Sequence, residues 1–83
     1  MIGTPEHTAF ELKKIIEGLT SIPAGELAGG ESIADILAGD SLSWMEFTVA
    51  VEHTFGVRMD FDRWCEVDTI ASAAAYICGG KVE

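Results

Sequence analysis

Ser41 is the residue in this chain whose type and position are best suited to chemistry. It lies in the stretch Gly39-Asp40-Ser41-Leu42, at the predicted start of an apolar helix that ends near Phe55. The first turn of a helix has backbone N–H groups without helical partners and carries the positive end of the helix dipole. An anionic group on the Ser41 hydroxyl, such as a phosphodiester, is favoured there. This position suits a serine that carries a group better than one that catalyses a reaction.

A catalytic role for Ser41 would need a base. Gly-Asp-Ser-Leu also resembles the motif of the GDSL esterases, which activate their serine with a distant Asp-x-x-His, a nucleophile–base–orienter arrangement. The chain contains no Asp-x-x-His, and its histidines are His7 and His53. His53 lies on the same predicted helix as Ser41, about 18 Å away at 1.5 Å per residue. We therefore expect no catalytic residue. The simpler alternative is that Ser41 only helps to cap the helix.

The charge and the cysteines restrict the classes of partner. The chain has 14 acidic and 5 basic residues, for a net charge of −9. Such a surface disfavours nucleic acid and anionic membranes as partners. It suits either a basic protein partner or solubility alone, and the charge does not decide between them. Cys65 and Cys78 form no CxxC pair, which predicts thiols in a reducing cytosol and no metal site. There is no signal-peptide pattern, and no apolar run reaches the roughly 18 residues of a membrane span. We expect a cytoplasmic protein.

The apolar periodicity predicts the helices that position Ser41. A first helix is expected over about residues 5–19, because Thr4 and Pro5 suit a helix start and an apolar stripe follows at helical spacing. Residues 20–40 then form a long connection with apolar anchors and a short turn near residues 33–37. Asp40 is expected to cap the second helix and Gly56 to end it.

Two further helices complete the expected fold. Asp60 is a suitable cap for a short helix over residues 61–66, and either Asp68 or Thr69 caps a last helix that ends at Gly79-Gly80. No alternating strand pattern competes. The sequence therefore predicts an all-α single domain over residues 1–83. It is a small four-helix bundle of three main helices and one short helix, with a long first loop.

On a helical wheel, the second helix turns one side to the core and the other to solvent. Its core side is expected to hold Trp44, Phe47, Val51 and Phe55. Leu42 and Val49 flank the polar side and are expected to be exposed.

The chain resembles the acyl carrier and peptidyl carrier proteins over nearly its whole length. The resemblance centres on Asp40-Ser41-Leu42. It extends at fixed spacing through Ser32-Ile33-Ala34-Asp35, Glu46, Val51-Glu52, Phe55, Val57, Met59, Asp60, Thr69-Ile70 and Ala75-Tyr76-Ile77.

The resemblance implies an acyl-carrier-like bundle in which Ser41 receives 4′-phosphopantetheine from coenzyme A. A separate phosphopantetheinyl transferase, with Mg²⁺, would attach the group, and an acyl- or aminoacyl-loading enzyme would place the cargo on its thiol. A downstream acyltransferase, synthase or condensation enzyme would take the cargo over. The chain itself would then be a carrier and no enzyme, and we expect it to be a monomer.

The resemblance also assigns roles around Ser41. Asp40 and Leu42 flank the attachment point. Glu46, Val49 and Glu52 are expected to dock partner enzymes. Trp44 and Met45 are expected either to wall the mouth of a cargo pocket or to belong to the core, with core or pocket wall favoured over docking for Trp44.

Some residues depart from carriers of primary fatty-acid synthesis. Ser43 and His53 stand where those relatives commonly have acids, and Trp44 is bulkier than usual at its position. These differences favour a free-standing carrier of a specialised pathway, polyketide or nonribosomal peptide. The alternatives are a fatty-acid carrier and an unmodified helical interaction module with the same fold.

Overall fold

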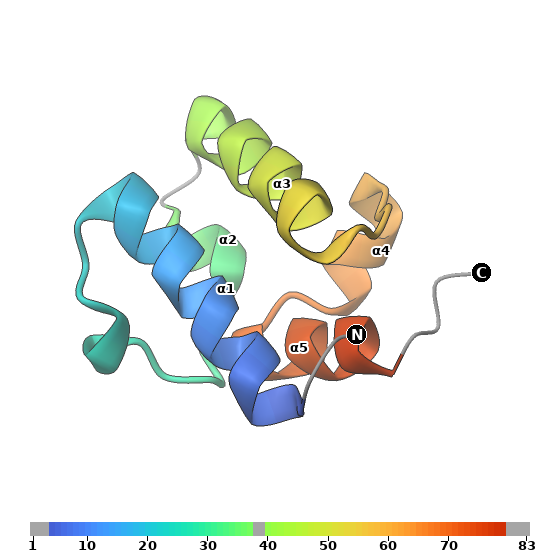
Figure 1. The fold of residues 1–83 in the computed structure, drawn as a ribbon. Helices are drawn as coiled ribbons and strands as arrows, with labels where there is room; N and C mark the ends of the chain where they lie inside the picture. The colour runs from blue at the N-terminus through green and yellow to red at the C-terminus, as the bar shows by residue number, and fades with distance from the viewer. Residues whose placement is uncertain (1–3, 38–39, 80–83) are drawn as a thin grey trace.

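The computed structural model describes residues 4–37 and 40–79, and this part of the chain is helical with no strand (Figure 1). The elements in chain order are α1 (Pro5–Thr20), the short 3₁₀ helix η1 (Ala24–Glu26), α2 (Ile33–Ile36), α3 (Ser41–Phe55), α4 (Phe61–Glu66) and α5 (Ile70–Cys78). The all-α prediction is confirmed, with α1, α3 and α5 as the main helices and α4 as the short one. Gly39 and Gly80, which the sequence placed before α3 and after α5, lie outside the described residues.

The helix starts follow the capping residues in the sequence. Thr4 Oγ1 accepts a hydrogen bond from the His7 N–H at 3.2 Å, and Asp60 Oδ1 accepts one from the Arg63 N–H at 2.9 Å. Of the two candidates before α5, Thr69 is the cap, because its Oγ1 accepts from the Ser72 N–H at 3.0 Å. Local capping therefore sets where α1, α4 and α5 begin.

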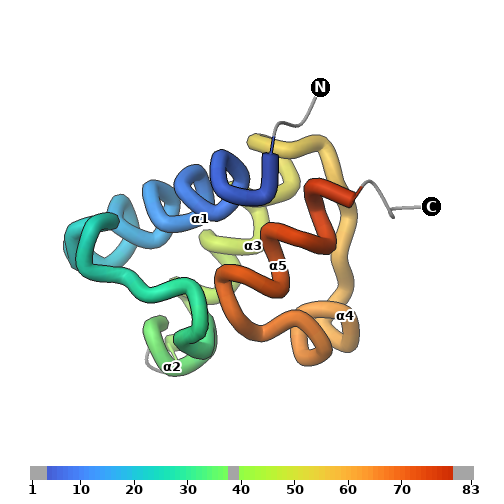
Figure 2. Tube along the Cα trace, turned by 90° about the horizontal axis from the view of Figure 1, so that it is seen from below, coloured from blue at the N-terminus to red at the C-terminus, as the bar shows by residue number. Residues whose placement is uncertain are grey.

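The hydrophobic core lies where α1, α3 and α5 meet. It contains Leu12 and Ile16 from α1, Phe47 and Val51 from α3, and Ile70, Ala73, Ala74 and Ile77 from α5. Small alanine side chains let α5 lie close alongside α1, as both views show (Figures 1 and 2). On α3, the predicted core side is confirmed: Phe47 and Val51 are fully buried, and Trp44 and Phe55 are partly buried against the core.

The long first loop is fixed to the core by the apolar anchors that the sequence indicated. Leu27, Ile33 and Leu37 are buried. The expected turn near residues 33–37 is a short helix, α2, whose N-cap Ser32 accepts a hydrogen bond from the Asp35 N–H at 3.3 Å. The loop thus adds two short elements, the 3₁₀ helix η1 and the helix α2, to the four helices that were predicted.

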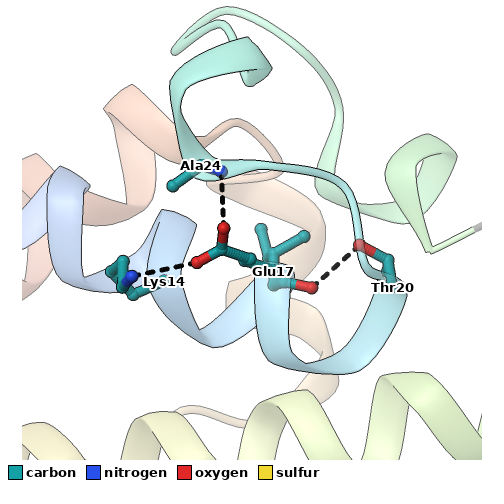
Figure 3. Close-up of polar contacts among 5 residues, drawn as sticks. Lys14, Glu17, Thr20 and Ala24 are labelled. Carbon is teal, nitrogen blue, oxygen red and sulfur yellow. Dashed lines mark hydrogen bonds and ion pairs between the residues drawn. The ribbon is translucent and has the colours of Figure 1, made fainter.

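A polar corner holds the start of this loop against α1 (Figure 3). Glu17 pairs with Lys14 Nζ at 3.0 Å and accepts a hydrogen bond from the Ala24 N–H at 3.4 Å. Both partners stabilise the charged form, so the Lys14 ammonium and then the Ala24 N–H hold the pKa of Glu17 below its usual range. Thr20 Oγ1 donates to the Ile16 carbonyl at 2.9 Å at the end of the helix. The Glu17 carboxylate therefore joins the start of η1 to α1.

Candidate functional site

Ser41 is the first residue of α3 and is exposed. The preceding residue, Asp40, is the N-cap. Its Oδ1 accepts hydrogen bonds from the N–H groups of Leu42 at 3.0 Å and Ser43 at 3.4 Å, and its Oδ2 accepts one from Ser43 Oγ at 3.2 Å. The helix therefore begins at Ser41, directly after the expected Asp40 cap, with the Ser41 hydroxyl at its amino end and open to other molecules.

The cap changes one expectation about Ser41. The N–H groups of the first turn were expected to favour an anion, but those of Leu42 and Ser43 already donate to Asp40. A phosphodiester on Ser41 would therefore meet the positive end of the helix dipole without these two donors. Asp40 rigidifies the start of α3 and adds a negative charge beside the serine.

A cavity of about 370 Å³ opens next to Ser41, between α2, α3 and α4. Its lining residues are Ala34, Leu37, Asp40, Ser41, Trp44, Phe61, Trp64, Cys65 and Asp68. This volume is near the lower end of the roughly 300–1,000 Å³ typical of small-molecule sites. The serine and the cavity thus form one continuous site.

Aromatic rings form much of the cavity wall. The ring of Trp44 meets that of Phe61 at a centroid distance of 6.5 Å and an interplanar angle of 80°, and that of Trp64 at 5.8 Å and 76°. Trp64 is only 2% exposed, whereas Phe61, at 66% exposed, lies at the rim. The expected pocket role of Trp44 agrees with this geometry, and its partial burial lets it serve as both core residue and wall.

Met45, which was expected at the mouth of a pocket or in the core, neither lines this cavity nor is buried. Its side chain is 61% exposed, because it lies on the outer face of α3. Instead of Met45, Phe61 and Trp64 of α4 form this part of the cavity wall. Phe61 and Trp64 are spaced i, i+3 on a short helix, and that spacing is the signal that would have placed both rings on one face.

The α2 side of the cavity is fixed by Asp68, which the sequence had offered as a helix cap. Its carboxylate accepts hydrogen bonds from Ser32 Oγ and, at 3.2 Å, from the Ala34 N–H. Its carbonyl accepts from the Ile33 N–H at 2.7 Å. Asp68 therefore joins α2 to the turn before α5 and sets the position of Ala34 and Leu37 on the cavity wall.

The outer face of α3 carries an apolar stripe beside the serine. Leu42, Met45 and Val49 are 63%, 61% and 51% exposed, as Leu42 and Val49 were expected to be. Their i, i+3, i+7 spacing places them in one row. Glu46 is exposed next to this row, and Glu52 is half-buried further along the helix. The face has the mixed apolar and acidic character expected of a docking surface.

The described residues give no support to a catalytic Ser41, a metal site or a membrane span. His53 lies in the last turn of α3, at the opposite end from Ser41. Within residues 4–37 and 40–79, no group of three or more His, Cys, Asp or Glu side chains is placed to hold a metal ion. No helix in that part of the chain has the length and apolarity to cross a membrane. Cys65 is exposed on α4, and no disulfide joins it to Cys78.

Comparison with known proteins identifies a family over most of the chain, and it is the family that the sequence resembled. The family described as "Phosphopantetheine attachment site" matches residues 11–77. An acyl carrier protein of Acidothermus cellulolyticus is 37% identical over 82 residues, which span 99% of this chain and 98% of that protein. A meromycolate extension acyl carrier protein of Mycolicibacterium smegmatis is 34% identical over 77 residues, 93% of this chain and 78% of the relative.

A solved structure supports the fold independently. The acyl carrier protein of Enterococcus faecalis superimposes with a TM-score of 0.73 at 30% identity, over 93% of this chain and 98% of that one. The family match, the identities and the bundle all agree. The chain therefore belongs to the acyl carrier proteins, which hold 4′-phosphopantetheine covalently and act as carriers rather than as enzymes.

Proposed function

We propose that Ser41 is the attachment point of the phosphopantetheine arm, and that this carrier presents acyl or aminoacyl thioesters to the enzymes of a specialised biosynthetic pathway. The observation that carries the assignment is the position of Ser41: an exposed hydroxyl on the first residue of α3, fixed by the Asp40 cap and open to an apolar cavity. Ser43, the next serine, already donates its hydroxyl to Asp40. Ser41 is thus the better placed of the two.

The chain's own contribution is position and access. The attached arm supplies a thiol on a long flexible chain, and the transferase supplies the chemistry of attachment. Asp40 holds the helix start, so the serine is presented in a fixed direction to an incoming enzyme. The exposed row of Leu42, Met45 and Val49, with Glu46 beside it, offers a surface that basic partners can approach. Charge there affects the rate and orientation of encounter more than the affinity.

Two observations support a specialised pathway. The first is the low acidic content of α3, whose acidic residues are Glu46 and Glu52. A carrier that serves many basic enzymes is expected to have more acidic residues on this helix. The cavity is small and walled by rings, a shape that suits a compact cargo better than a long flexible chain. A fatty-acid role is the second candidate, because several relatives are named acyl carrier protein or meromycolate extension acyl carrier protein.

The attachment site is tested by the intact mass of the protein after incubation with coenzyme A, Mg²⁺ and a promiscuous phosphopantetheinyl transferase. We expect a gain of one phosphopantetheine for the natural chain and for Ser43→Ala, and none for Ser41→Ala. A gain that persists in Ser41→Ala would assign the arm to another residue. No gain with several transferases would favour the unmodified interaction module.

The pathway is tested by the cargo. The protein is purified from its own host, and the group on the arm is released and its mass measured. A compact acyl, polyketide-type or aminoacyl group supports the proposal. A series of long saturated chains that differ by two carbons would instead support the fatty-acid role.

A further inference from the structure

The cavity beside Ser41 combines apolar walls with fixed negative charge. Trp44, Phe61 and Trp64 supply three rings, and Asp40 and Asp68 supply two carboxylates. None of the described residues that line the cavity is basic. A group that enters this space therefore meets aromatic surface and negative potential, and no positive side chain in the lining.

Both carboxylates are held in place. Asp68 is half-buried, and its two oxygens accept hydrogen bonds from Ser32 and Ala34 of the α2 segment. Asp40 is held by the N–H groups at the start of α3. Each carboxylate keeps further lone pairs, because ionised carboxylates have about four acceptor sites. Neither group needs to leave its partners to attract a cation.

These features discriminate between cargoes by charge. A carboxylate on the cargo is repelled by Asp40 and Asp68 and also by the negative phosphodiester on Ser41. An ammonium group is attracted by all three. The faces and edges of the rings accept an apolar side chain, and ring faces also attract a cation.

We infer that this carrier favours a compact aminoacyl group, with its apolar side chain against Trp44, Phe61 and Trp64 and its α-ammonium at the Asp40–Asp68 rim. The inference rests on Ser41 as the attachment point. The cavity opens directly at Ser41, so the flexible arm must fold back to place its cargo there, which costs chain entropy. Occupation is therefore reversible, and the cargo stays available to a visiting enzyme.

The inference is tested with three cargoes that differ at one position. The transferase loads the natural chain with coenzyme A analogues that carry phenylalanyl, 3-phenylpropanoyl or benzylmalonyl groups through a hydrolysis-resistant amide. These place an ammonium, a hydrogen or a carboxylate on the same carbon. Melting temperatures are measured at pH 6.5, below the ordinary pKa of about 7.7–8.0 for an α-amino group. We expect the phenylalanyl form to melt about 3–5 °C above the 3-phenylpropanoyl form, and the benzylmalonyl form to melt lowest.

Two variants test whether the Asp68 carboxylate at the rim of the cavity causes this difference in melting temperature. They are Asp68→Asn and the matched control Asp62→Asn. Asp62 is exposed on α4 and does not line the cavity. The difference between the phenylalanyl and 3-phenylpropanoyl forms should fall to half or less in Asp68→Asn and stay unchanged in Asp62→Asn. Both forms of a variant share any loss of fold stability, so the difference between them reports on the contact between cargo and cavity and not on the stability of the fold.

The outcomes separate the inference from the proposed function. A chain whose mass shows no loaded arm on Ser41 refutes the attachment point, and the inference with it. Full loading with no difference between the phenylalanyl and 3-phenylpropanoyl forms, or with the benzylmalonyl form melting highest, refutes the inference alone. An equal difference in Asp68→Asn and in the natural chain also overturns it, because the rim carboxylate would then have no part in the selection.

Discussion

Ser32 Oγ donates a hydrogen bond to the carboxylate of Asp68, a residue 36 positions further along the chain. The backbone of the same two segments is joined again by the isolated bridge between Ser32 and Thr69 and by the bond from the Ile33 N–H to the Asp68 carbonyl at 2.7 Å. These contacts hold α2 against the short segment between α4 and α5. They therefore position the α2 wall of the cavity beside Ser41.

Replacing either partner should loosen this wall. We expect Asp68→Asn to lower the free energy of unfolding by about 1–2 kcal/mol, because a charged acceptor of two hydrogen bonds becomes a neutral one. Ser32→Ala should cost a similar amount, since Ser32 also caps α2. Urea unfolding of both single variants and the double variant measures the coupling. Additive losses in the double variant would show that the two side chains do not stabilise the fold together. As a control, Asp62→Asn should stay within about 0.5 kcal/mol of the natural chain.

The two tryptophans should differ in their contribution to stability. Trp64 is 2% exposed and packs on Phe47 at a centroid distance of 5.2 Å, so Trp64→Ala should cost about 3–5 kcal/mol. Trp44 is only partly buried, so Trp44→Ala should cost less, about 2–3 kcal/mol. Thermal and urea unfolding test the order. A larger loss of unfolding free energy for Trp44→Ala than for Trp64→Ala would contradict this order. The aromatic cluster would then be stabilised more by the ring in the cavity wall than by the buried ring.

Much of the helical fold was predictable because its boundaries depend on neighbouring residues. Asp60 predicted α4 over residues 61–66, and Gly56, with a φ of 70°, ends α3 as expected. Caps and C′ glycines act through hydrogen bonds to the same turn, so the local sequence contains the information. The exposed position of Ser41 followed from the same signals.

The cavity was much less predictable, because it depends on contacts between distant segments. Nothing in the sequence near Asp68 distinguishes a helix cap from a residue that binds the start of α2, and Thr69 next to it has the capping role. The misplaced Met45 has the same origin. Its direction depends on which side of α3 receives α4, and the helical spacing of α3 alone does not contain that information.

Glu46 offers a test of the proposed docking face. Glu46→Lys should slow modification by a phosphopantetheinyl transferase on the order of three- to tenfold at low salt, because attraction to a basic enzyme becomes repulsion. The helical circular dichroism should be unchanged, since Glu46 is exposed. Glu6→Lys, in the first turn of α1, changes the net charge equally and serves as the control. Equal rates for the two variants would remove Glu46 from the docking surface, and added salt should reduce the difference.

Substitutions at the carboxyl ends of α1 and α3 should change the stability of the fold in opposite directions. Ser21 ends α1 with a φ of 68°, a left-handed conformation that is costly for serine and easy for glycine. Ser21→Gly should therefore raise the free energy of unfolding by about 0.5–1 kcal/mol. Gly56 has the same conformation at the end of α3, so Gly56→Ala should lower it by about 1 kcal/mol. Thermal unfolding checks both signs, and a loss of stability in Ser21→Gly would contradict the strain argument.

The contribution of Glu17 to the free energy of unfolding should depend on pH. The Lys14 ammonium and the Ala24 N–H hold the pKa of Glu17 below its usual range in the folded state. Its stabilising contribution is therefore complete above the unfolded pKa of about 4.3 and is lost as the pH falls through the lower folded value. The chain has 14 acidic residues, so the contribution of Glu17 is isolated by comparing the natural chain with Glu17→Gln. The stability difference between them should be constant from about pH 7 to pH 5 and should shrink toward zero below that. A Glu17→Gln difference that stays constant down to pH 2 would show that the corner does not depend on the charge of Glu17.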